Sequence, residues 1–211
     1  MATLLAVWFE PATGDMADQA GAAEDGEAEA QGEELEVTWL RRVAAGDERA
    51  MQLLFDRWKL PLLSFFYRSL GSNADAEDLT LEVFVRVHRA AARYRPQAKF
   101  STYLFQIAHN LLRNERRRRR RKPADPVPPE TFDYTLADDD GSARRLAELE
   151  ELFQRALAQL PEKYRTPLLL LQQQQMAAAE AATVLGITEN SLRVLVHRGR
   201  QMLKTQMEAL S

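Results

Sequence analysis

Two carboxylates four positions apart, Asp78 and Glu82, are the residues of this chain best placed to do chemistry. On a helix this spacing puts both on one face, where they could hold Mg²⁺ for hydrolysis of a phosphodiester bond. Such sites usually draw carboxylates from several elements, and the sequence shows no further converging acid, so a nuclease is a minor alternative. No metal-ligand spacing connects the three histidines, His88, His109 and His197. We therefore expect no metal site, no cofactor and no enzymatic activity.

Binding rather than catalysis is favoured by two amphipathic helices predicted between residues 73 and 122. The first has an acidic face above an apolar stripe. The acids are Asp75, Glu77, Asp78 and Glu82, and the stripe is Leu79, Val83 and Val87. The second ends in six arginines, 116–121, and its buried face is predicted from the three-and-four spacing of Leu104, Ile107, Ala108, Leu111 and Leu112. An acidic face suits a basic protein surface and an arginine run suits a polyanion, so the pair suggests an adaptor between a protein and a nucleic acid.

The loop between these helices combines aromatic and basic side chains. Tyr94 and Phe100, beside Arg93, Arg95 and Lys99, could stack on an unpaired base, which contributes about 1–3 kcal/mol per base. The alternative for both rings is that they fill the core between the helices. The arginine run has an alternative too, a solvated helix end, but as the extension of an amphipathic helix it indicates phosphate binding.

The charges fall into blocks, although the whole chain has a net charge of only -3. Residues 1–36 carry a net charge of -10, residues 37–122 carry +11, residues 123–150 carry -6 and residues 151–211 carry +2. A basic block of this size is typical of proteins that bind nucleic acid.

Composition and periodicity predict two small helical domains and no strands. Residues 1–34 have almost no periodicity and are expected to form a disordered acidic tail. A first helical domain is predicted over 35–122, with a turn at Gly46-Asp47 and a kink or restart at Pro61. Residues 123–144, rich in proline and acids, are predicted to be a flexible linker, and residues 145–211 to be a second helical domain.

A helix-turn-helix is predicted near the end of the chain. A first helix is followed by a turn at Gly186-Ile187 and a second helix that Thr188 caps. On the second helix the inner face is predicted to be Leu192, Val196, Gly199 and Leu203. Its outer face, where a major groove would lie, is predicted to be Asn190, Arg193, His197, Arg200 and Lys204.

The chain has no cysteine and no run approaching the ~18 apolar residues that a membrane span needs. Its first residues are mildly apolar without a basic flank, which argues against a signal peptide. We therefore expect a cytoplasmic protein without direct membrane insertion.

These segments resemble the extracytoplasmic-function (ECF) sigma factors of the sigma-70 family. DAEDLTLEVFVRVHRA followed by FSTYLFQIAHNLLRNERRRR is similar to region 2 of that family. LPEKYRTPLLLL followed by MAAAEAATVLGITENSLRVLVHRGRQMLK is similar to region 4. The resemblance covers about residues 35–122 and 145–207. It implies an all-α fold and a factor that directs RNA polymerase to promoters, without chemistry of its own.

The resemblance also implies which residues bind. The surface for the β′ clamp helices of core RNA polymerase would be Asp75, Glu77, Asp78, Glu82, Val83 and Arg86. The minus-10 element, with a flipped base of its non-template strand, would be bound by Arg93, Tyr94, Lys99, Phe100, Ser101, Thr102, Asn110, Arg113, Arg116 and Arg117. The minus-35 element would be bound by Asn190, Arg193, His197, Arg198 and Arg200. Expected partners are core polymerase (β′ clamp helices and β flap), promoter DNA and an anti-sigma factor.

Several positions depart from the family pattern. Leu81 replaces a usual glutamine, Tyr103 a usual tryptophan, and Gln175 a frequent glycine. Val194 and Leu195 replace commonly polar residues of the recognition helix, which suggests an unusual promoter or a weakened minus-35 contact. The alternative function is a stand-alone helix-turn-helix regulator that binds DNA without polymerase.

Overall fold

The computed structural model describes residues 21–121 and 142–210, and all regular structure within these ranges is helical. The all-α fold expected from the sequence is confirmed. Most of the predicted linker, and residues 1–20 of the predicted tail, lie outside the described residues. None of the described helices is both long and apolar enough to cross a membrane.

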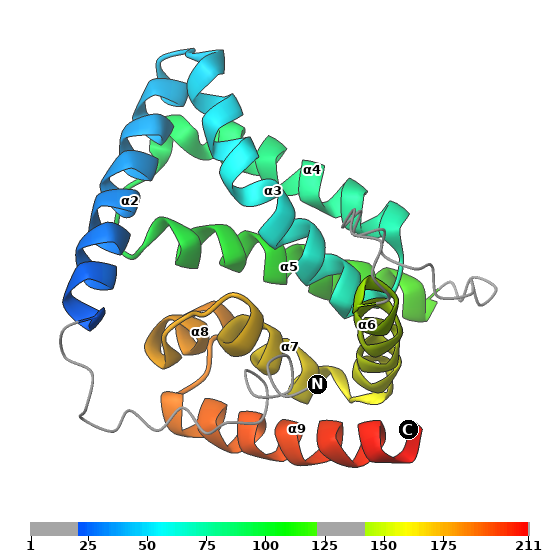
Figure 1. Ribbon diagram of the computed structural model, residues 1–211. Coiled ribbons are helices and arrows are strands. Elements are labelled where there is room, and N and C mark those ends of the chain that lie inside the picture. The colour runs from blue at the N-terminus through cyan, green and yellow to red at the C-terminus, as the bar shows by residue number, and fades with distance from the viewer. Residues whose placement is uncertain (1–20, 122–141, 211) are drawn as a thin grey trace.

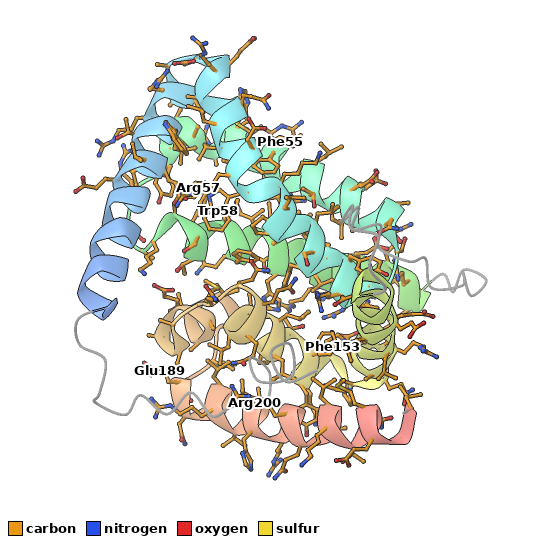
Figure 2. All side chains as sticks on the ribbon, viewed as in Figure 1. Phe55, Arg57, Trp58, Phe153, Glu189 and Arg200 are labelled. Carbon is orange, nitrogen blue, oxygen red and sulfur yellow. The ribbon has the colours of Figure 1, made fainter. Side chains whose placement is uncertain are left out.

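The first helix begins earlier than its periodicity suggested. α2 runs Gly21–Ala44, so residues 21–34 are helical and the predicted disorder of this part is wrong. The segment is rich in Ala and Glu, and both residues have high intrinsic helix propensity, which explains a helix without an apolar stripe. Glu36 anchors the helix to α3, because its carboxylate accepts a hydrogen bond from Trp58 Nε1 at 2.8 Å and pairs with Arg57 at 2.6 Å. Figure 2 labels Arg57 and Trp58 on α3.

The turn predicted at Gly46-Asp47 is confirmed. Gly46 has a φ of 88°, a backbone conformation that would be strained in a residue with a side chain. Asp47 caps the N-terminus of α3, Glu48–Leu70. The Asp47 carboxylate accepts hydrogen bonds from the backbone N–H groups of Arg49 and Ala50. Arg42 also pairs with it, and the hydrogen bond from Arg42 is the main reason why the pKa of Asp47 is lowered.

Pro61 lies inside α3 and does not restart it, because the helix is continuous from Glu48 to Leu70. Residues after the proline, among them Leu62, Phe65 and Phe66, are completely buried. Their burial outweighs the cost of about 3 kcal/mol that proline imposes inside a helix.

The two helices on which the predicted sites depend follow. α4 is Asn73–Ala90; Gly71, at a φ of 70°, ends α3, and the Ser72 hydroxyl caps α4 by accepting from the N–H of Asp75. A short 3-10 helix, η1 (Ala91–Arg93), leads to a loop and then to α5, Phe100–Arg121. Since α5 begins at Phe100, Ser101 and Thr102 lie in its first turn and are not its caps.

The second half of the chain contains α6 (Ser142–Gln159), α7 (Glu162–Leu168), a π-helical turn η2 (Leu169–Gln173), α8 (Ala178–Leu185) and α9 (Glu189–Leu210). The predicted helix-turn-helix is confirmed as α8, a turn at Gly186 with a φ of 67°, and α9. The Thr188 hydroxyl accepts from the N–H of Ser191, as a capping residue should. The inner face is confirmed by the burial of Leu192, Val196, Gly199 and Leu203.

The two halves pack directly on each other, which the sequence did not predict. Figure 1 shows α6, α7 and α8 along one side of α3 and α5, with α9 on the far side of this second layer. Helices α3 and α5 contact α6, α7, η2 and α8. The completely buried rings Phe65, Phe66, Phe100 and Phe105 belong to the first half, and Leu157, Leu160 and Leu168 to the second.

Candidate nucleic-acid and protein interfaces

The solvent face of α4 combines acids with exposed apolar side chains. Glu77 and Asp78 are exposed, while Leu81 and Val85, one turn apart, are 54% and 40% exposed. Glu82 accepts a hydrogen bond from Arg86 at 2.8 Å on the same face. Large apolar side chains left in water beside carboxylates are typical of a surface that a protein partner covers.

Two residues expected on this face are used inside the molecule. Asp75 pairs with Arg119 and, at 3.8 Å, with Arg118, which attaches the start of α4 to the end of α5. Val83 is completely buried and fixes α4 against the core. The structure therefore brings together Glu77, Asp78, Glu82 and Arg86 on one face, but not Asp75 or Val83.

An aromatic cluster lies where α5 begins. The Tyr94 ring is 4.9 Å from that of Tyr103 and 6.4 Å from that of Phe100, measured between centroids. Phe100 is only 1% exposed, so it has the core position that was its alternative, whereas Tyr94 is half-buried. Burial also raises the pKa of Tyr103. Of the ring-bearing residues predicted to bind DNA, Tyr94 is thus the one that a base can reach.

The polar residues predicted around this loop differ in accessibility. Arg93 is exposed, Ser101 is half-buried, and Thr102 is buried, with only 1% of its surface exposed. Lys99 pairs with Glu180 of α8 at 3.2 Å. This ion pair joins the loop to the helix-turn-helix.

The middle of α5 is partly covered by α8. His109 is hydrogen-bonded to the backbone of Val184, and burial, followed by the charge of Arg113, lowers its pKa. Asn110 and Arg113, on neighbouring positions, are exposed. The helix-turn-helix therefore covers one edge of the predicted DNA face of α5 and leaves the other edge in solvent.

The arginines at the end of α5 have different partners. Arg116 is buried and donates to Thr166 Oγ1 at 3.1 Å and to the carbonyl of Ser69 at 3.4 Å. Arg118 and Arg119 donate to Glu115, and Arg120 pairs with Glu162 at 3.2 Å. Arg117 is exposed, and so is Arg121. The arginine run was predicted to bind phosphates as a whole. Because successive residues of a helix point in different directions, some of these arginines instead bind other parts of the protein and the others face solvent.

The outer face of α9 carries four of the five predicted minus-35 residues. Asn190, Arg193, His197 and Arg198 are exposed. Glu189, labelled at the start of the helix in Figure 2, lies 3.5 Å from Arg193. Arg200 differs, because it is half-buried, burial lowers its pKa, and its Nε has no hydrogen-bond partner among the described residues. Val194 is 44% exposed on the same helix.

Sequence reasoning missed the residues that join the two halves. Glu150 of α6 pairs with Arg68 at 2.8 Å, and the Arg68 guanidinium lies 5.1 Å from the centre of the Phe153 ring. Burial raises the pKa of Glu150 against the opposing effect of Arg68. Arg165 of α7 donates to the carbonyl of Ser69 at 2.8 Å and to those of Ala158 and Leu160, and burial lowers its pKa to about 10. Scattered charges in different helices give no periodic signal, so no sequence pattern could have identified this seam.

A metal-ligand cluster is not formed by the described side chains. In residues 21–121 and 142–210 no three His, Cys, Asp or Glu side chains come together in a way that could hold an ion. The pair that suggested a nuclease, Asp78 and Glu82, lies on an open helix face where Glu82 is bonded to Arg86.

Fold and surface together define an all-helical protein with a helix-turn-helix and a separate helical half that bears acidic and basic faces. Residues 54–122 match the family model of sigma-70 region 2, and residues 150–203 match that of sigma-70 region 4. The chain is 30% identical over 181 residues to the ECF RNA polymerase sigma factor SigW of Bacillus subtilis, across 81% of this chain and 96% of that protein. It is 28% identical to the RNA polymerase sigma-H factor of Pseudomonas aeruginosa, across 84% and 96%.

Solved structures show the same fold. CnrH, in complex with the cytosolic domain of CnrY, has a TM-score of 0.61 at 22% identity, and the alignment covers 84% of this chain and 99% of that one. The sigma factor RpoE in complex with the anti-sigma factor NepR from Bartonella quintana has a TM-score of 0.59 at 17% identity, covering 74% and 96%. The chain belongs to the ECF RNA polymerase sigma factors of the sigma-70 family, and its function is promoter-directed initiation of transcription.

Proposed function

We propose that this sigma factor binds core RNA polymerase through the solvent face of α4 and promoter DNA through the start of α5 and the outer face of α9. The observation that carries the proposal is the composition of the α4 face. Glu77 and Asp78 lie beside Leu81 and Val85, and all four side chains are exposed to solvent. A partner with basic and apolar groups, the β′ clamp helices, would bury both kinds of side chain.

Leu81 fits this role although the family usually has glutamine there. It is 54% exposed and has no part in the core, so its side chain is available to the partner. An exposed leucine contributes about 1.5–3 kcal/mol when it becomes fully buried. The departure from the family pattern therefore strengthens the apolar part of the docking surface.

The minus-10 contact is proposed to centre on Tyr94. Its half-buried ring is held by Tyr103 and Phe100 at one end of α5, close to the exposed Arg93. A ring fixed in this way loses little entropy when a base stacks on it. Phe100 and Thr102 support this site from within, since both are buried.

The minus-35 contact is proposed to use Asn190, Arg193, His197 and Arg198, which are exposed on one helix that a major groove can admit. Val194 adds an exposed apolar side chain among them, suited to a thymine methyl group. An anti-sigma factor is the further partner that we propose, as in the complexes of CnrH and RpoE.

Transcription with purified core polymerase tests the docking surface. Asp78→Arg reverses a charge at an exposed position of α4, so we expect the variant to fold normally, to lose co-elution with core polymerase, and to give no run-off product. Glu208→Arg is the matched control, because Glu208 is also an exposed acid but lies at the end of α9. Normal run-off by Asp78→Arg, or equal loss in both variants, would contradict docking through α4.

A further inference from the structure

The start of α7 packs against the middle of α9, next to one of the predicted minus-35 residues. Figure 1 shows the two helices as neighbours in the second layer, and they contact each other directly. Gly199 of α9 permits this contact, because a Cβ there would lie 3.3 Å from Tyr164 Cβ. The residue before the glycine, Arg198, is exposed. Tyr164 therefore lies beside a residue expected to bind DNA, although the sequence gave no reason to assign it a role.

The hydroxyl group of Tyr164 connects two cations. Its oxygen accepts hydrogen bonds from the side chains of Lys163 and Arg198, and these bonds, the one from Lys163 above all, lower the pKa of Tyr164. The Lys163 ammonium group also lies 4.9 Å from the centre of the Tyr164 ring, a cation–π distance. Lys163 and Arg198 are both exposed, whereas Tyr164 is half-buried. The phenol thus holds together two positive charges that would otherwise repel each other.

The nearest acid in the chain does not neutralise this pair of cations. Glu162, directly before Lys163, pairs instead with Arg116 and Arg120 of α5. Among the residues that the structure describes, neither Lys163 nor Arg198 forms an ion pair with a carboxylate. Two exposed cations held side by side suit a phosphate group, which is the anion that the DNA backbone presents.

The phase of α9 places Arg198 at one border of its outer face. Successive residues are about 100° apart around a helix, so Arg198 lies about 140° from Arg193, with Val194 and His197 between them. When a helix lies in a major groove, side chains at the middle of its exposed face meet base edges, and those at its borders meet the sugar-phosphate backbone. Arg198 is therefore directed towards the backbone rather than the bases.

We propose that Tyr164 is a positioning residue for promoter binding, which holds Arg198 beside Lys163 so that both cations bind one backbone phosphate next to the major groove of the minus-35 element. This deepens the proposed function, on which it rests, because it extends the minus-35 surface from α9 to α7. It also changes the role expected of Arg198 from reading bases to binding the backbone. The alternative is that the bond between Arg198 and Tyr164 only fastens α9 to α7.

The probe is a DNA duplex that the chain itself selects. The unmodified full chain is used to select short duplexes from a pool with a randomised centre, since the outer face of α9 is exposed. A phosphate contact does not depend on the base sequence. We therefore expect Arg198→Gln to select the same bases as the unmodified chain while binding every duplex more weakly, and Arg193→Gln to select different bases.

The salt dependence of binding counts the phosphate contact. Loss of one contact on duplex DNA reduces the magnitude of the slope of log affinity against log salt concentration by about 0.9, and we expect this change in Lys163→Gln/Arg198→Gln. The matched control is Lys59→Gln/Arg41→Gln. It removes the same charge from two exposed residues of the first half, and Lys59 also lies over an aromatic ring, that of Phe55. We expect the control to change the slope by less than half as much.

A double-mutant cycle isolates the contribution of Tyr164. Tyr164→Phe removes a hydrogen bond and no charge, so binding of the selected duplex should weaken about two- to tenfold. This weakening should vanish in an Arg198→Gln background and persist in an Arg193→Gln background, because Tyr164 holds only Arg198. Arg198→Gln should also raise the pKa of Tyr164, measured from the phenolate absorbance that Tyr164→Phe lacks. Tyr103→Phe, at a half-buried tyrosine of the first half, should bind the duplex normally.

Three results would overturn the positioning role: no duplex retained by the unmodified chain, normal binding by Tyr164→Phe, or an equal effect of Tyr164→Phe in both arginine backgrounds. Selection of different bases by Arg198→Gln would overturn the backbone contact. Thermal unfolding confirms that each variant is folded. If the unmodified chain co-elutes with core polymerase and the cycle shows no coupling, only this inference is wrong; if the unmodified chain fails to co-elute, the proposed function is wrong.

Discussion

Glu115 shows how much a single residue of α5 depends on its neighbours. It is only 8% exposed, yet it is held as a carboxylate by hydrogen bonds from Arg118 Nε at 2.7 Å, Arg118 Nη2 at 2.8 Å and Arg119 Nε at 3.1 Å. The bond from Arg118 is the main reason why the pKa of Glu115 is lowered. Because the folded protein binds this proton more weakly than the unfolded chain does, Glu115 stabilises the fold where it is ionised.

The pH dependence of stability should report this. Glu115→Gln is expected to lower the free energy of unfolding by about 1–3 kcal/mol at pH 7, because hydrogen bonds to a charged acceptor are lost. The difference from the unmodified chain should shrink as the pH falls below about 4.3, the ordinary value for glutamate, since Glu115 itself is then being protonated. Urea unfolding at pH 7 and at acidic pH measures this difference in the free energy of unfolding, with a substitution at an exposed position, Glu208→Gln, as the control. A difference that persists unchanged in acid would contradict this role.

At the scale of single residues, the sequence predicted which types of side chain could bind a partner better than it predicted which of them are exposed. Tyr94, Asp78 and Arg193 are all where a partner can reach them. Val83 and Arg116 are not, because helix periodicity predicts which residues share a face but not which face a distant element covers. Arg116 has an exposed neighbour of the same type, Arg117, and the packing of α3 and α7 around Arg116 distinguishes them.

At the scale of elements, Gly199 explains how α9 approaches α7. A Cβ at this position would lie 2.9 Å from Leu168 Cδ1 and 3.3 Å from Tyr164 Cβ. Leu168 is completely buried, so its side chain can withdraw only by displacing other core atoms. The glycine is therefore needed for close helix contact, and not for an unusual backbone conformation.

Substitution at Gly199 should be costly for this reason. Gly199→Val is expected to destabilise the protein by about 1–3 kcal/mol through overpacking, in spite of the better helix propensity of valine. Gln201→Val, at an exposed position of the same helix, should change stability by less than about 0.5 kcal/mol. Thermal unfolding compares the stability of the two variants. Equal melting temperatures would show that the contact between α9 and α7 accommodates a side chain at position 199 without loss of stability.

Element boundaries were predictable where capping residues mark them. Asp47, Gly186 and Thr188 all end or begin helices as their types suggested. The errors came from residues whose local preference is overridden or was underestimated. Pro61 is accommodated because large apolar residues follow it, and residues 21–34, rich in Ala and Glu, form part of a helix although they have no apolar stripe.

At the scale of the whole molecule, the seam between the halves is a polar interface with incomplete compensation. Arg68 pairs with Glu150, but Arg68 Nε and Nη1 are buried without hydrogen-bond partners among the described residues. Unsatisfied buried donors are costly, so Arg68 contributes less to the seam than a fully hydrogen-bonded guanidinium would. It also covers Lys99 and His109, so a promoter that contacts them has to displace α8.

Removing Glu150 should open the seam. Glu150→Ala leaves Arg68 buried and unpaired, which costs about 3–5 kcal/mol and is relieved when the halves separate and water reaches the guanidinium. Because the chain has no native cysteine, donor and acceptor dyes can be attached at Gln52→Cys on α3 and Lys204→Cys on α9. Energy transfer should fall in Glu150→Ala and remain high in Glu151→Ala, whose position is exposed. Unchanged transfer in both would mean that the seam does not depend on this pair.

The last turn of α3 has a consequence for how the two halves communicate. Its carbonyls receive donors from three other helices: Tyr67 from Gln154, Ser69 from Arg116 and Arg165, and Leu70 from Arg119. Gly71 stops the helix at this point. The last turn of α3 is thus a point of attachment for several elements. If it unfolded locally, the end of α5, the start of α4 and the half that contains the helix-turn-helix would lose their hydrogen bonds to it together.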